Sequence, residues 1–345
     1  MEQDDVVVQR LLGVIVRAAQ AIDTTDQHLA ALLDEASALL WYLKPGTPPL
    51  SLATLKHYIT LPLEHWLDER TRQGFTGSLR LGGAPSLLCD EILLELDPKK
   101  GWERVQTIIA QVRDLCRTRE HGEAEYRVFR RFLIEHGVVD VDQTLDFLMP
   151  LGVGFTTLYE PIPLHDQKAG MIYLCPSCRW PMRLDHSQVR CGSQWCLETA
   201  GVFEWRHGVL ISAKYATTVE PQPVENTQRL KTALWKFTLI PGLIELRLYK
   251  RFMEMGLHPE LWPEVDQADI RLLIGDKKID LDAKVWASTG LLGNHLEMLD
   301  SRETWVIIPD YQKSYVHSLN ETCPPNLMVM SESQCVRKVS QLCPR

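Results

Sequence analysis

The octapeptide IDLDAKVW, residues 279–286, places Asp282 and Lys284 two positions apart, a spacing that suits metal-dependent hydrolysis. In a strand, side chains two residues apart point to the same face, so this carboxylate and ammonium lie side by side. Mg²⁺ prefers carboxylate oxygen and usually takes one or two protein carboxylates. Asp269, in the preceding segment, can supply the second one. We therefore expect Asp269 and Asp282 to bind Mg²⁺ or Mn²⁺ and Lys284 to assist the attacking water.

A β-hairpin must position these residues. Residues 269–274 alternate as a half-buried strand does, residues 275–278 supply turn chemistry, and residues 279–286 alternate again. Upstream, apolar residues recur at helical spacing over residues 241–253. Glu245 lies in the first turn of this predicted helix and can supply a third acid.

This order of parts, a helix glutamate, a strand aspartate, a hairpin and then Asp-x-Lys, resembles the PD-(D/E)xK superfamily of restriction-endonuclease-like nucleases. The resemblance covers residues 230–310. It implies that Asp269 is the principal metal ligand and Asp282 the second. It further implies that Glu245 is the helix acid and Lys284 the catalytic lysine. The chain has alanine where the family name has proline before Asp269, and aspartate rather than glutamate before Lys284; both variations are common there.

More narrowly, the stretches WPEVDQADIRL, IDLDAKVWAS and TWVIIPD are similar to those of restriction-endonuclease-like proteins encoded beside prokaryotic PIWI-like (pPIWI-RE) genes in phage-defence islands. This resemblance implies a metal-dependent DNA endonuclease that hydrolyses phosphodiester bonds in an anti-phage or anti-plasmid defence system. It also implies that other proteins of the same system are partners.

The same residues have a plainer interpretation. A strand reading Asp-x-Asp-x-Lys is most often the exposed polar face of an antiparallel hairpin. The domain could then be a non-catalytic nucleic-acid- or protein-binding adaptor built on a nuclease-like fold. Clustering of Asp269 and Asp282 around one metal favours the enzyme, whereas dispersed side chains favour the adaptor. Asp266 and Asp280 are supporting acids of open role, and a lone helical histidine such as His295 is more often a satisfied surface residue.

Four of the nine cysteines form two close pairs, Cys175 with Cys178 and Cys191 with Cys196. Two such pairs on separate knuckles can close a tetrahedron of thiolates, the ligand set of structural Zn²⁺ sites. The sequence therefore predicts a zinc ribbon, whose metal affinity is linked to folding. A second hypothesis gives the ribbon nucleic-acid contacts through exposed aromatic and guanidinium groups, namely Arg179, Trp180, Arg183, Arg190 and Trp195.

The chain is predicted to be a multidomain α+β protein. A helical N-terminal region precedes the ribbon; it is either a helix-turn-helix DNA reader or, as is commoner for such patterns, a bundle that docks a partner. The helix and strand order of the last part predicts a mixed sheet flanked by helices. The predicted divisions are residues 1–165 for the helical region, 166–216 for the zinc ribbon, 217–226 for a linker and 227–345 for the nuclease domain, which opens with a helix over 227–237.

The composition and charge of the chain limit which partners it can have. At 45% hydrophobic and 24% charged residues, with no apolar run of membrane-spanning length, we expect no membrane contact. The acidic N-terminal residues do not resemble a signal peptide, so we expect a cytoplasmic location. Because the formal net charge is −8, DNA contact must come from a partner or from local basic patches, such as Arg247, Lys250 and Arg251, or Arg127, Arg130 and Arg131. A double-strand cut needs two sites, which makes a homodimer a reasonable expectation.

Overall fold

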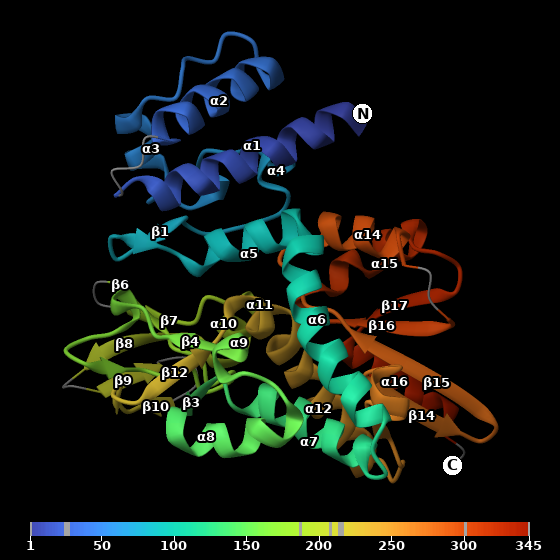
Figure 1. Cartoon of the computed structure of the whole chain (residues 1–345). Coiled ribbons are helices and arrows are strands. Elements are labelled where there is room, and N and C mark those ends of the chain that lie inside the picture. The colour runs from blue at the N-terminus through green and yellow to red at the C-terminus, as the bar shows by residue number, and fades with distance from the viewer. Residues whose placement is uncertain are drawn as a thin grey trace.

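The computed structural model describes residues 2–23, 28–185, 188–206, 209–212, 217–299 and 302–343 (Figure 1). The predicted α+β class is confirmed. A helical N-terminal part, a four-cysteine cluster and a C-terminal mixed sheet follow one another along the chain.

Helices dominate the first part of the chain. Aspartate and serine caps begin several of them; the Asp140 side chain, for example, accepts the N–H groups of Asp142 and Gln143 at the start of α8. The helices are α1 (Glu2–Ala21), α2 (His28–Leu43), α3 (Leu52–Tyr58), α4 (Glu69–Arg72), α5 (Leu87–Leu96), α6 (Pro98–Arg117), α7 (Gly122–Glu135), α8 (Val141–Leu148) and α9 (Phe155–Leu158). A short hairpin, β1 (Arg80–Leu81) and β2 (Ala84–Pro85), precedes α5.

Small antiparallel sheets are formed by the part of the chain that contains the four cysteines. The largest is a five-stranded meander in the order β10-β9-β8-β7-β6. Its strands are β6 (Arg183–Asp185), β7 (Gln188–Arg190), β8 (Val202–Arg206), β9 (Val209–Ser212) and β10 (Thr217–Val219), and α10 (Gln194–Ala200) lies between β7 and β8. Strands β5 (Met171–Ile172) and β11 (Gln222–Pro223) form a separate pair. Residues 217–226, predicted to be a linker, thus contain β10 and β11.

The predicted helix over residues 227–237 is wrong in its first half. Residues Thr227–Leu230 form β12, the central strand of a three-stranded sheet between β3 (Val138–Asp140) and β4 (Tyr159–Pro161). Both partner strands lie far back in the sequence, so no local pattern revealed them. The helical turn begins only at α11 (Thr232–Leu234) and continues as a π-helix, Trp235–Leu239, into α12 (Ile240–Glu254).

The C-terminal part is built on a five-stranded sheet in the order β13-β14-β15-β16-β17. The first three strands are antiparallel and the last three are parallel, which confirms the predicted mixed sheet. The strands are β13 (Glu260–Leu261), β14 (Ile270–Ile274), β15 (Lys277–Ala283), β16 (Thr304–Ile308) and β17 (Leu327–Ser331). The remaining helices are α13 (Pro263–Asp266), α14 (Thr289–Glu297), α15 (Val316–Thr322) and α16 (Glu332–Leu342).

Two hydrophobic clusters join this sheet to the rest of the molecule. One contains Leu281 and Ile307 together with residues of α6, α7, α12 and the cysteine cluster. The other contains Val306 and Ile308 together with residues of α1, α5 and α14. Because adjacent residues of a strand face opposite sides, β16 packs against both clusters, and the sheet is buried between them.

A buried ion cluster also ties α5 to the C-terminal part. The Lys236 ammonium contacts the carboxylates of Glu91 and Glu95, with Glu95 at 2.7 Å. Glu95 in turn accepts the backbone N–H groups of Ala287 at 2.6 Å and Ser288 at 2.9 Å. All three charged side chains are buried. Losing one partner would leave an uncompensated buried charge, so this cluster fixes the position of the segment that follows β15.

Within the described ranges, no helix is long and apolar enough to cross a membrane.

Candidate active site

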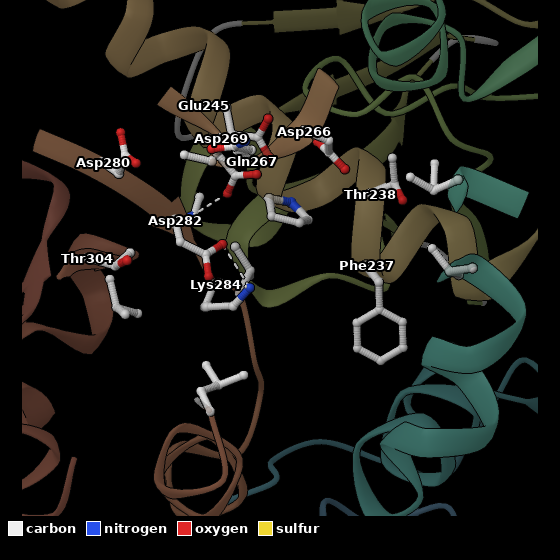
Figure 2. A pocket seen from close by; sticks show the side chains of 18 of the residues that line it. Phe237, Thr238, Glu245, Asp266, Gln267, Asp269, Asp280, Asp282, Lys284 and Thr304 are labelled. Atoms are coloured by element: carbon white, nitrogen blue, oxygen red, sulfur yellow. Dashed lines mark hydrogen bonds and ion pairs between the residues drawn. The ribbon is translucent and has the colours of Figure 1, made fainter. Parts of the chain in front are cut away.

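The hairpin of β14 and β15 places Asp269 beside Asp282. The backbone N–H of Asp269 donates to the Leu281 carbonyl at 3.1 Å, and the Ala283 N–H donates to Asp269 Oδ2 at 2.7 Å. Asp282 lies between these two positions on the opposite face of β15 from the buried Leu281 and Ala283. The two carboxylates and the Lys284 ammonium, 2.7 Å from Asp282 Oδ2, therefore meet at one point (Figure 2).

This point lies inside a cavity of about 430 Å³. Side-chain exposure is 17% for Asp269, 28% for Asp282 and 14% for Lys284. Burial and the nearby carboxylates of Glu245 and Asp282 raise the pKa of Asp269 well above its usual range. Burial also opposes ionisation of Asp282, but the Lys284 charge outweighs it and lowers the pKa of Asp282. The pKa values of these two neighbouring carboxyl groups are therefore shifted in opposite directions.

Glu245 stands behind these two acids, fully buried on α12. Its Oε2 accepts the Trp262 indole N–H at 2.6 Å, and its Oε1 lies 3.5 Å from the Arg130 guanidinium. Burial raises the pKa of Glu245 to about 7, against the lowering effect of Arg130. Both of its oxygens are thus engaged by protein donors.

Arg130 is the residue that sequence analysis placed wrongly. Predicted as part of a surface basic patch, it is buried and lies between three carboxylates, 3.5 Å from Glu245 and 3.8 Å from both Asp266 and Asp269. Its guanidinium also lies over the Trp262 ring, 5.6 Å from the centroid. Arg130 comes from α7, so the helical N-terminal part contributes a cation to the acid cluster of the C-terminal sheet.

The turn that carries Trp262 and Asp266 has an unusual backbone. Four of its residues have positive φ angles, namely Trp262 at 46°, Glu264 at 52°, Val265 at 57° and Asp266 at 76°. Such angles cost of order 1–3 kcal/mol each outside glycine, and a β-branched residue such as Val265 adopts them rarely. The contacts of Trp262 and Asp266 with Glu245 and Arg130 hold this turn against the acid cluster.

The other candidate groups differ in their surroundings. Asp280 is engaged by Arg271, whose Nε and Nη2 donate to it at 2.7 and 3.0 Å. His295 lines the cavity and stacks on Trp286 with 5.0 Å between ring centroids. Burial and the Lys284 charge lower the pKa of His295 to about 4. His295 is therefore neutral at physiological pH.

The four predicted zinc cysteines form a second, separate cluster. Cys175, Cys178, Cys191 and Cys196 are buried, and their sulfur atoms all lie within 4.8 Å of one another. In the described part of the chain, this is the only group of three or more potential ligands that converges so closely, and the acids of the cavity do not. The cluster could hold a metal ion. The hypothesis of nucleic-acid contacts through exposed groups is contradicted for Trp180, Arg183 and Trp195, because all three side chains are buried.

Two protein-family models match the chain. Residues 242–343 match the model described as "REase associating with pPIWI_RE". Residues 8–140 match the model described as "pPIWI_RE three-gene island domain Y". These matches associate the chain with pPIWI_RE defence islands. No curated protein and no solved structure matches it.

The predicted association with these islands is confirmed, and the two matched segments meet in the cavity. The REase-associated segment contains Glu245, Asp269, Asp282 and Lys284, whereas Arg130 belongs to the domain Y segment. In the sequence, the four cysteines lie between the two matched segments.

Proposed function

We propose that the chain is a metal-dependent endodeoxyribonuclease that acts in the defence system of its island. The observation that carries this proposal is the convergence of Asp269, Asp282 and Lys284 in one cavity. The match to a REase-associated family supports it. The partial burial of these three side chains argues against the plainer interpretation, an exposed polar face of a hairpin.

The donor set suits a hard divalent cation. Carboxylate oxygens of Asp269 and Asp282 come from adjacent backbone segments, and Mg²⁺ usually takes only one or two protein carboxylates. Asp269 accepts the Ala283 N–H through Oδ2, so Oδ1, which lies 3.8 Å from the Arg130 guanidinium, is the oxygen that would contact a cation. Mg²⁺ or Mn²⁺ held there would polarise the phosphate and lower the pKa of a bound water.

The protein's own residues supply the rest. Lys284, held beside Asp282, orients the attacking water and offsets charge that develops on the phosphate. Glu245 acts as a positioning residue, because its oxygens already accept from Trp262 and face Arg130. We also propose that the four cysteines hold a structural Zn²⁺, which metal analysis of the purified protein will test as one zinc per chain. Other proteins encoded in the island are the expected partners.

Cleavage assays test the catalytic proposal. Plasmid and single-stranded DNA are incubated with the protein in Mg²⁺, in Mn²⁺ and in chelator. We expect metal-dependent cutting that falls at least about 100-fold in Lys284→Ala, because one preorganised charge is lost at the reacting phosphate. Lys277→Ala is the matched control: it removes an exposed lysine from the same strand and should cut normally.

Two results would overturn the nuclease. One is cutting that survives Lys284→Ala. The other is absence of cutting even when the co-encoded island proteins are added, which would favour a non-catalytic adaptor.

A further inference from the structure

The cavity has a second polar wall that the acids do not use. Two residues that line it, Arg113 and Thr238, each have a buried atom, Nε and Oγ1, that lacks a hydrogen-bond partner among the described residues. Nε of Arg130 also lacks a hydrogen bond, but it lies 3.8 Å from Asp266. Buried donors are normally paired, so orphaned ones at a cavity need an explanation such as a ligand. Figure 2 shows Thr238 across the cavity from Asp282 and Lys284.

Arg113 is the cation of this wall with the least local compensation. Arg130 already faces three carboxylates. Among the described residues, Arg113, on α6, has one acidic neighbour in ion-pair range, Asp114, at 3.9 Å, and its side chain is 26% exposed. Arg113 thus lines the cavity with a guanidinium whose Nε lacks a hydrogen bond, whereas the guanidinium of Arg130 serves the acid cluster.

A guanidinium and a hydroxyl from residues that line one cavity suit an anion with several acceptor oxygens. A phosphodiester has this chemistry, and arginine binds phosphate with fixed donor geometry. The acid wall would repel a phosphate, so one bound in the cavity would have to lie on the Arg113 side. We propose that Arg113 and Thr238 bind a backbone phosphate of the nucleic acid; this rests on the proposed nuclease function. The domain Y segment then supplies part of the substrate site.

The test measures binding rather than cutting. In the Lys284→Ala background with Ca²⁺, fluorescence anisotropy follows a fluorescein-labelled oligonucleotide, single-stranded and as a duplex, over a range of salt concentrations. Loss of one phosphate contact lowers the slope of log K against log salt by about 0.7 for a single strand or 0.9 for a duplex. We expect that change, with about tenfold weaker binding, in Arg113→Gln. Comparison of the two oligonucleotides identifies the preferred substrate.

Arg117→Gln is the matched control. Arg117 lies one turn further along α6, shares Asp114 as its acidic neighbour at 3.5 Å and is 47% exposed, but does not line the cavity. It should keep the wild-type slope. Arg113→Lys keeps the positive charge, so it should show the wild-type slope although it lacks the guanidinium group. Thr238→Val, which removes a neutral hydroxyl of similar size, should weaken binding several-fold without changing the slope.

Three outcomes would overturn the proposal. The first is a wild-type slope in Arg113→Gln, and the second is an equal loss in Arg113→Gln and Arg117→Gln, which would indicate general electrostatics. The third is absence of salt-dependent binding by the parent protein. None of these outcomes decides whether Lys284 is needed for cleavage. The binding experiment can therefore contradict the phosphate site without contradicting the nuclease, which the cleavage assay tests.

Discussion

At the scale of single residues, the cavity brings acidic and basic side chains together, and their burial makes an uncompensated charge costly. Asp269, Asp282 and Glu245 stand on one side, and Arg130 and Lys284 compensate them from two parts of the chain. Because the side chains are buried, each neighbour changes the protonation of the next. His295 is not one of these acids, but its pKa is lowered by burial and by the charge of Lys284.

We predict a pH-dependent contribution of His295 to stability. The folded pKa of about 4 lies below the ordinary value of 6.5, so between these values the unfolded chain binds a proton that the folded chain does not. Stability is therefore lost as pH falls from 6.5 towards 4. After discounting for partial exposure, the loss is on the order of 2 kcal/mol.

Urea unfolding of wild type and His295→Gln at pH 7.5 and pH 4.5 measures this contribution. The advantage of wild type over the variant should shrink at the lower pH. A difference that is equal at both pH values would contradict the assignment.

The sequence pattern was sufficient to place those residues whose neighbours in the site are close in the sequence. Asp282 and Lys284 share a face because a strand alternates, and that rule needs no tertiary information. Arg130 depends on partners 115 or more positions away, such as Glu245. A signal was nevertheless present, since Arg130 falls on the same buried face of α7 as Tyr126, Phe129 and Leu133. An arginine in that register indicates a buried acid partner.

At the scale of elements, the contact of α12 with α7 sets the distance between Glu245 and Arg130. Gly242 makes this contact possible: a Cβ built there would lie 2.4 Å from both Cδ1 and Cγ1 of Ile134. The two helices therefore approach more closely than a side chain at this position would allow. Strand β12 also depends on distant partners. Its sequence suggested a helix, but pairing with β3 and β4 makes it a strand.

We predict that Gly242→Ala destabilises the protein by about 1–3 kcal/mol, since Ile134 or a helix must shift. Denaturant unfolding measures the loss, and Ile134→Val in the same chain should recover part of it by removing one clashing atom. Gly290→Ala in α14 is the control, because its nearest new contact is 3.9 Å away. Equal effects of the two alanines would exclude the packing explanation.

At the scale of the whole molecule, the predicted domains share their cores. The cysteine cluster belongs to the same hydrophobic cluster as α7, α12 and the sheet. Gly192, beside Cys191, would clash with Leu87 of α5 if it carried a Cβ, with 2.2 Å to the nearest atom. The ribbon is thus packed into the fold rather than attached to it.

Removal of the proposed zinc ion from the cysteines should therefore affect the entire protein. We expect chelator-treated protein and Cys191→Ser to melt at a lower temperature in one cooperative transition, because metal binding is linked to folding. Circular dichroism and tryptophan fluorescence should give coincident curves. Two separate transitions, with the sheet unchanged, would show that the ribbon folds alone.

The buried ion cluster has a consequence for protein synthesis. Glu91 leaves the ribosome 145 positions before Lys236, and the hairpin with Asp282 follows later still. Until Lys236 is made, Glu91 and Glu95 lack the ammonium group that they contact in the folded protein. We expect prematurely terminated chains to lack the completed cavity, so that a truncated product would not carry the activity proposed for the whole chain.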